Sequence, residues 1–169
     1  MRGPIINEAQ ALGTVSATGL TSLIEGGSYG GNLLVNTVTF DGGTENGIGD
    51  HDGTSDPYTV FTVTGTVLME LYQVCTTALV GATATVQMGV TGATTAFIGV
   101  TTATDIDVDE IWFDTSPTTT YDLLTVAGLR KQLINRGNNI QIEVATQNIT
   151  AGVIDFVCIW TGINGGTVT

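Results

Sequence analysis

Hydrophobic and polar residues alternate along much of this chain, most clearly between residues 138 and 163. Ile140, Ile142 and Val144 share one parity, which is the period-two spacing of a half-buried strand. A polar turn at 146–152 separates them from a second apolar run at 153–160. Two strands this close in sequence predict a hairpin.

The second run carries hydrophobic side chains on both parities. A strand that is apolar on both faces needs cover on both, so we expect the hairpin to lie centrally in a packed sheet. The expected core face carries Ile154, Phe156, Cys158 and Trp160. The opposite face carries Asp155, Val157 and Ile159. Either the second sheet or a neighbouring subunit covers that second face, and we favour the subunit.

The same period predicts further strands upstream. The longest runs from Tyr58 to Val74, and Gly65 inside it marks a bulge or bend. Such a long, bent strand serves two sheets or runs the length of a sandwich. Shorter strands are expected at 33–40, 83–90, 96–100 and 121–126. Residues 129–134 fit a helical turn or a strand equally well, and residues 164–169 are expected to fray.

Composition supports the same fold class. The 169 residues suffice for one domain with a real core, which we place at residues 30–169. Hydrophobic residues make up 42% of the chain, charged residues only 12%, and there are 23 glycines, a balance typical of all-β proteins. The low charge density fits a surface that meets other subunits, and a solvated, threonine-rich β surface explains it equally well.

Residues 1–29 have no strong period. They contain too many apolar side chains for a disordered tail and too few for a pair of core strands. We therefore expect an extended N-terminal arm that becomes ordered against a neighbouring subunit.

The net charge of −12 excludes nucleic-acid binding through phosphate neutralisation, which needs clustered basic residues. Arg130, Lys131 and Arg136 form a small basic spot; it fits an acidic partner surface or, as we favour, a solvated turn. No apolar run is long enough for a signal peptide or a transmembrane span, so no membrane partner is expected.

The loop at 41–57, DGGTENGIGDHDGTSDP, is dense in glycine and acids and holds the only histidine, His51. Its oxygen ligands suggest calcium. However, the sequence 50–53 fits neither the glycine nor the acid position of an EF-hand loop. We therefore assign no metal and favour a solvated loop. The acids concerned are Asp41, Glu45, Asp50, Asp52 and Asp56.

A second acidic stretch, 105–114, reads DIDVDEIWFD and is expected to be a strand. Paired carboxylates such as Asp107 and Glu110 suggest a glycosidase. Asp105, Asp107 and Asp109 would share one face of that strand, and a solvated edge explains the pattern more simply.

Other chemistry has no motif to support it. Nothing places a nucleophile beside a base, and no phosphate-binding loop is present, so we assign no catalytic residue and no cofactor. Cys75 and Cys158 lie in strand-like runs and are expected to be buried free thiols. Trp160 is expected in the core, whereas Trp112 fits stacking on a sugar or anchoring an interface.

Three segments between Phe40 and Ile163 resemble a family of small β-sandwich virion proteins of tailed bacteriophages. They are FTVTGTVLMELYQVCTTALVGATATVQMGV, TTATDIDVDEIWFDTSP and NITAGVIDFVCIWTGI. Members often close with an arginine-rich tail, whereas this chain has Trp160-Thr161-Gly162-Ile163, so a partner contact at that place is not carried over.

The resemblance implies a capsid decoration, or cement, protein: a jelly-roll-like antiparallel β-sandwich, homotrimeric, bound to the major capsid protein on the virion surface and assembled in the host cytoplasm. Three-fold sites on a shell match a trimer. The alternative is a β-rich tail-fibre or receptor-binding protein with a carbohydrate groove.

Overall fold

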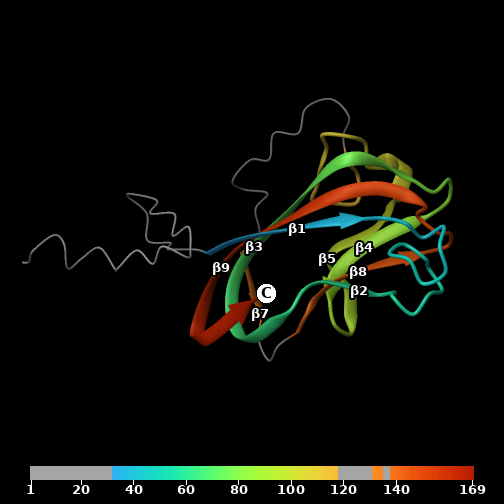
Figure 1. The fold of residues 1–169 in the computed structure, drawn as a ribbon. Helices are drawn as coiled ribbons and strands as arrows, with labels where there is room; N and C mark the ends of the chain where they lie inside the picture. Colours follow the sequence, from blue (N-terminus) through green and yellow to red (C-terminus); the bar gives the residue numbers. More distant parts are fainter. Residues whose placement is uncertain (1–31, 118–130, 135–137) are drawn as a thin grey trace, which may run out of the picture.

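The computed structural model describes residues 32–117, 131–134 and 138–169, which form two antiparallel β-sheets packed face to face (Figure 1). These residues contain no α-helix. The expected all-β antiparallel sandwich is thus confirmed. The predicted arm at 1–29 and the predicted strand at 121–126 lie outside the described residues.

Each sheet is built from strands that are far apart in the sequence. Sheet A has the order β1 (Asn32–Thr39), β9 (Ala151–Val168), β3 (Val63–Val80) and β6 (Ile111–Trp112), with β7 (Lys131–Ile134) also paired to β3. Sheet B has the order β2 (Tyr58–Phe61), β8 (Ile140–Ala145), β4 (Thr85–Val90) and β5 (Ala93–Thr102). The segment 129–134, left open by its pattern, is a strand in its described part.

The hairpin predicted for residues 138–163 is wrong. β8 pairs with β2 and β4 in sheet B, whereas β9 pairs with β1 and β3 in sheet A. The connection at 146–150 therefore crosses from one sheet to the other. Both strands are nevertheless central in their own sheets, as the apolar pattern indicated.

The long run beginning at Tyr58 serves both sheets, which is one of the two arrangements expected for it. Its first part is β2 in sheet B, and after Thr62 it continues as β3 in sheet A. The pairing of β3 with β9 is irregular around Gly65, whose φ of 71° is left-handed. The predicted bulge at this glycine is confirmed, and it lies within sheet A, after the chain has changed sheets at Thr62.

β6 and β7 are two pieces of one interrupted edge. Ile111 and Trp112 pair with Val74 and Gln73, and β7 then continues the same antiparallel register from Glu70 to Val67. The chain therefore leaves the edge of sheet A after Trp112 and is paired to it again from Lys131.

The C-terminal residues are not frayed, contrary to expectation. β9 continues to Val168, which is buried, and Thr169 exchanges backbone hydrogen bonds with Thr62 at 2.7 and 2.9 Å. A Cβ atom on Gly166 would lie 1.9 Å from the carbonyl oxygen of Thr66. The lack of a side chain there lets the two backbones approach closely.

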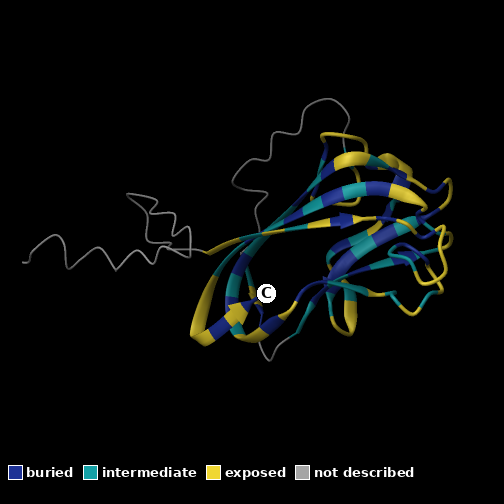
Figure 2. Ribbon diagram, in the orientation of Figure 1, coloured by how far each residue is buried: buried dark blue, intermediate teal, exposed yellow. Residues whose placement is uncertain are grey.

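The core lies between the sheets. Along β9, Ile154, Phe156 and Cys158 are fully buried and Trp160 packs against them half-buried, so the predicted core face is confirmed. Figure 2 shows the alternation of buried and half-buried positions along β3 and β9.

Candidate functional site

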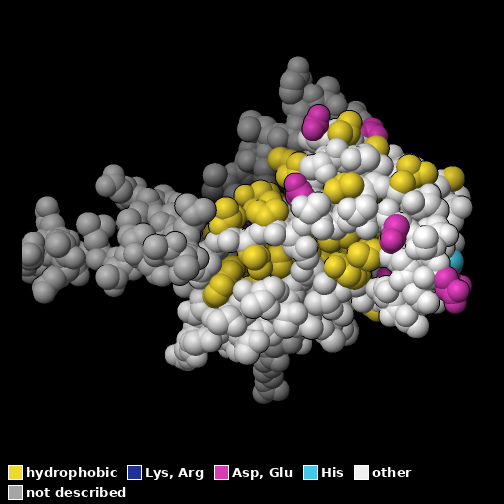
Figure 3. Space-filling view, viewed as in Figure 1, with side chains coloured by type: hydrophobic (Ala, Val, Ile, Leu, Met, Phe, Trp, Pro, Cys, Tyr) yellow, Lys and Arg dark blue, Asp and Glu magenta, His cyan; other side chains and the backbone are white. Residues whose placement is uncertain are grey.

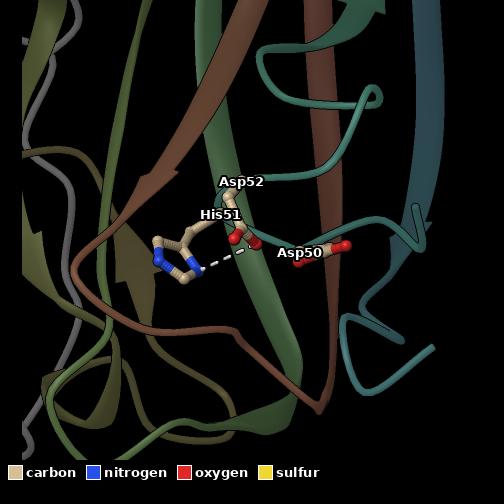
Figure 4. A group of neighbouring side chains, drawn as sticks. All are labelled: Asp50, His51 and Asp52. Atoms are coloured by element: carbon tan, nitrogen blue, oxygen red, sulfur yellow. Dashed lines mark ion pairs between the residues drawn. The ribbon is translucent and has the colours of Figure 1, made fainter. Parts of the chain in front are cut away.

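The loop at 41–57 brings together Asp50, His51 and Asp52, the group of potential metal ligands that converges within the described part of the chain (Figure 4). Their ligand atoms lie within 4.8 Å of one another. His51 Nδ1 is 3.7 Å from an oxygen of Asp52, and both side chains are exposed.

Asp50 is buried, and its carboxylate holds the loop together. Oδ2 accepts a hydrogen bond of 2.9 Å from the Asn46 backbone amide, and Oδ1 accepts one of 3.0 Å from Asn148 Nδ2. The bond from Asn46 lowers the pKa of Asp50 and outweighs the opposing effect of burial. The same Asn148 amide also donates to Gly42 O at 2.7 Å. This carboxylate therefore ties the loop to the turn before β9.

The geometry does not match a calcium site. Calcium takes six to eight oxygen ligands, whereas here both oxygens of Asp50 already accept hydrogen bonds and His51 Nδ1 bonds to Asn148 Oδ1. The remaining carboxylate of the group, Asp52, pairs with the His51 imidazole at 3.7 Å. We interpret the group as the organising centre of the loop. Much of the loop is thus ordered by side-chain contacts, rather than simply solvated.

Asp56 lies at the end of the same loop, and its pKa is shifted in the opposite direction to that of Asp50. Its Oδ1 accepts a 2.9 Å hydrogen bond from the Val144 backbone amide of β8. Burial raises its pKa to about 6, despite that hydrogen bond, and nearby Glu143 adds to the shift.

The second acidic stretch folds differently from the predicted strand. Ala103–Asp105 forms a 3-10 helix (η2), a turn follows, and only Ile111–Trp112 pairs as β6. The reason is Ile106, which is fully buried and draws the chain inward, so that the acids no longer alternate on one strand face. The expected solvent exposure is confirmed for Asp105, Asp107 and Asp109.

Glu110 is the exception in that stretch because its side chain is buried. Oε2 accepts a 2.8 Å hydrogen bond from the Asp107 backbone amide, and Oε1 has no hydrogen-bond partner among the described residues. Its backbone carbonyl accepts from Cys75 N at 2.8 Å, and Asp109 N donates to Cys75 O at 2.7 Å. The carboxylate thus closes a turn against β3, rather than facing a second carboxylate across a groove.

Both cysteines are free and buried, as predicted. Burial raises the pKa of Cys75 to about 11 and that of Cys158 to about 12. At neutral pH both are therefore inert thiols.

Trp112 lies in the core rather than at a binding surface. It is fully buried, and its Nε1 donates a 3.1 Å hydrogen bond to Thr101 Oγ1. Trp160 is also packed against the core, as expected.

Sequence reasoning missed a polar cluster on the outer face of sheet B. Gln87 Nε2 donates to Glu143 Oε2 at 2.6 Å and to Thr94 Oγ1 at 2.9 Å, and the Thr94 hydroxyl donates to the same carboxylate. The three residues come from three neighbouring strands. Only the strand register brings them together, so no local motif announces them.

Comparison with family models, with curated proteins and with solved structures finds no match to this chain. Among the described residues, no helix is long and apolar enough to cross a membrane.

Proposed function

We propose that this chain is a decoration, or cement, protein of a tailed-bacteriophage head, which binds the outside of the capsid and stabilises contacts between capsid subunits. In this proposal it acts as a homotrimer, its partner is the major capsid protein, and its N-terminal arm reaches the neighbouring subunits. No catalysis is assigned to it.

The proposal rests on one observation: the side chains that could take part in chemistry are hydrogen-bonded within the fold or buried in its core. Asp50 accepts a hydrogen bond from Asn148, Glu110 one from the backbone of its own turn, and Glu143 one from a neighbouring strand. Trp112, a candidate for sugar stacking, is sealed in the core. Side chains engaged in this way stiffen a framework, and a stiff framework is what a cement protein needs.

The segments that carry the resemblance support a structural role as well. Residues 61–90 contain β3 and β4, residues 101–117 contain η2 and β6, and residues 148–163 contain most of β9. All three supply strands and turns of the sandwich, so the likeness rests on the framework.

The strand order supports the finer proposal of a jelly roll. From β1 to β4 every connection crosses from one sheet to the other, as do those from β5 to β6, from β7 to β8 and from β8 to β9. Interleaving of this kind, with two four-stranded paths, is the pattern of two Greek keys wound together.

The rival proposal is a tail-fibre or receptor-binding protein. It needs a carbohydrate groove with exposed aromatic side chains. Within the described residues Phe113 is the large aromatic residue that is clearly exposed, and both tryptophans face the core. Binding of the isolated protein to a glycan array would favour this rival.

Electron microscopy of a purified particle tests the proposal directly. We expect density for this protein on the outer surface of the head, at three-fold or quasi-three-fold positions. Density on the tail would overturn the cement proposal.

A second test concerns the arm. Deletion of residues 1–29 is expected to abolish binding to the shell while circular dichroism still reports a folded β protein. Unchanged binding would refute the role of the arm.

A further inference from the structure

Sheet A carries hydrophobic side chains on the face turned away from sheet B. The register places them on one side, because paired residues of neighbouring strands point the same way. Leu33 pairs with Ile159, and Val35 pairs with Val157. On its other side Val157 pairs with Tyr72. We call this set the apolar face: Leu33, Val35, Leu68, Tyr72, Leu133, Val157 and Ile159.

The described residues leave this face uncovered. Leu33 is 59% exposed, Val35 50% and Leu133 63%. Figure 3 shows hydrophobic side chains gathered beside the first part of β1 and the strand next to it. A contiguous apolar surface rimmed by polar residues marks a place where further chain binds.

We propose that residues 20–24 of the same chain, LTSLI, lie across the apolar face and cover it. The segment supplies Leu20, Leu23 and Ile24, which are the kind of side chains that the face lacks. It is followed by Gly26, Gly27, Gly30 and Gly31, which permit the chain to turn back over the sheet.

The tether is long enough for this segment to reach the face. Residues 1–31 lie outside the described structure, and they end where β1 begins, one residue before Leu33. Leu33 follows Ile24 by nine positions, a reach of about 30 Å when extended. The face spans β1, β9, β3 and β7, which is about 14 Å at the usual strand spacing. The segment is therefore long enough to cross the whole face, and its effective concentration there is in the millimolar range.

Charge favours this occupant over a second copy of the chain. Residues 1–31 contain Arg2, Glu8 and Glu25, a net charge of −1. A second copy brings a net charge of −12, and the rows of the face hold Asp155 as well as Glu70, which the register pairs with Lys131. A symmetric pairing uses the same patch on both copies, so the interface would hold these acids twice. Like charges brought together in this way oppose association.

This inference does not rest on the proposed function. It differs from the sequence-based expectation that a neighbouring subunit covers Val157 and Ile159. Under it, residues 20–31 are held against the body, and residues 1–19 are what remains of the proposed arm.

Cysteine labelling of the full chain tests the proposal, because Cys75 and Cys158 are buried and unreactive in the folded protein. Val35→Cys reports on the apolar face. Val100→Cys is the matched control, since Val100 is a strand valine of similar exposure, 56%, in β5 of the other sheet. Alkylation with a maleimide under native conditions is followed by mass spectrometry.

We expect Val35→Cys to react about tenfold more slowly than Val100→Cys, the protection given by a cover worth about 1.4 kcal/mol. The ratio should be the same at all protein concentrations. Adding Leu20→Ser, Leu23→Ser and Ile24→Ser should raise the Val35→Cys rate to that of the control. Substituting the polar neighbours Thr14, Ser16 and Thr18 by alanine should leave the protection intact.

Three results would each overturn the proposal. Val35→Cys reacting as fast as Val100→Cys would mean that nothing covers the face. Protection that disappears on dilution would assign the cover to a second copy. Protection that survives the triple serine change at every concentration would assign it to another part of the chain. The inertness of Cys75 and Cys158 in each variant reports that the core is intact.

Discussion

The outer faces of the two sheets differ in how their side chains are satisfied. On sheet B, Gln87, Thr94 and Glu143 form a hydrogen-bonded cluster, and Gln141 donates to Thr59 at 3.2 Å. On sheet A, the corresponding face is occupied by Leu33, Val35 and their apolar neighbours. Sheet B pairs polar side chains with one another on its outer face, whereas sheet A presents apolar side chains there. The difference identifies sheet A as the side where additional chain is to be expected.

The largest loss of stability is expected for residues in the core that the two sheets share. Phe156, on the inner face of β9, is fully buried, whereas its neighbour Val157 points outward. Phe156→Ala should lower the free energy of unfolding by about 3–5 kcal/mol, through lost burial and the cavity left behind. Val157→Ala should cost about 1 kcal/mol, because the side chain is only half-buried. Urea denaturation measures both. Equal losses would contradict the assignment of inner and outer faces.

The polar network on sheet B predicts the next largest effect. Glu143→Ala removes the acceptor for Gln87 and Thr94 and should lower the free energy of unfolding by about 1–3 kcal/mol. Glu143→Gln, which keeps an acceptor oxygen, should cost clearly less. If Glu143→Ala and Glu143→Gln lowered the free energy of unfolding by the same amount, the network would not stabilise this face.

Much of this architecture follows from local pattern. The core face of β9 is evident from the spacing of Ile154, Phe156 and Cys158, and the bend at Gly65 from a glycine inside a strand. Side-chain period tells which residues face inward, because it depends on one strand alone. It does not tell which strand lies alongside, so the separation of β8 and β9 into different sheets was not predictable.

The remaining misses have related causes. The C-terminal residues carry no hydrophobic period, yet the close approach of Gly166 to Thr66 keeps them paired. Asp50 reads as one acid among many in its loop, and its burial depends on Asn148, 98 residues away. Contacts at such separations are set by the fold and leave no trace in neighbouring residues.

Asp56, at the edge of sheet B, gives a pH-dependent prediction. Its pKa is about 6 in the folded protein against an ordinary value of 3.8, so between these pH values the folded state holds a proton that the unfolded state has released. The free energy of unfolding therefore falls as pH rises from about 4 to 6 and stays lower above. Asp56→Asn keeps the acceptor for Val144 N and should remove this loss, a gain of about 1 kcal/mol at pH 7.5 after allowing for solvent screening.

Thermal or urea unfolding of Asp56→Asn and the unchanged chain at pH 4, 6 and 7.5 measures the effect. Their difference should grow with pH and reach a plateau above pH 6. A constant difference for Asp56→Asn would mean that the carboxylate is not perturbed by burial.

The smallest effect separates the two outer faces most directly. Val35 and Val100 are similarly exposed in the described structure. If only the described residues contacted them, replacing either valine by threonine should lower the free energy of unfolding by the same amount. If residues 20–24 cover the apolar face, Val35→Thr places a hydroxyl beneath them and should cost about 0.5–1 kcal/mol more than Val100→Thr. The excess should vanish when Leu20, Leu23 and Ile24 are changed to serine, because the cover is then already lost. Equal costs in the otherwise unchanged chain would show that sheet A, like sheet B, meets solvent on its outer side.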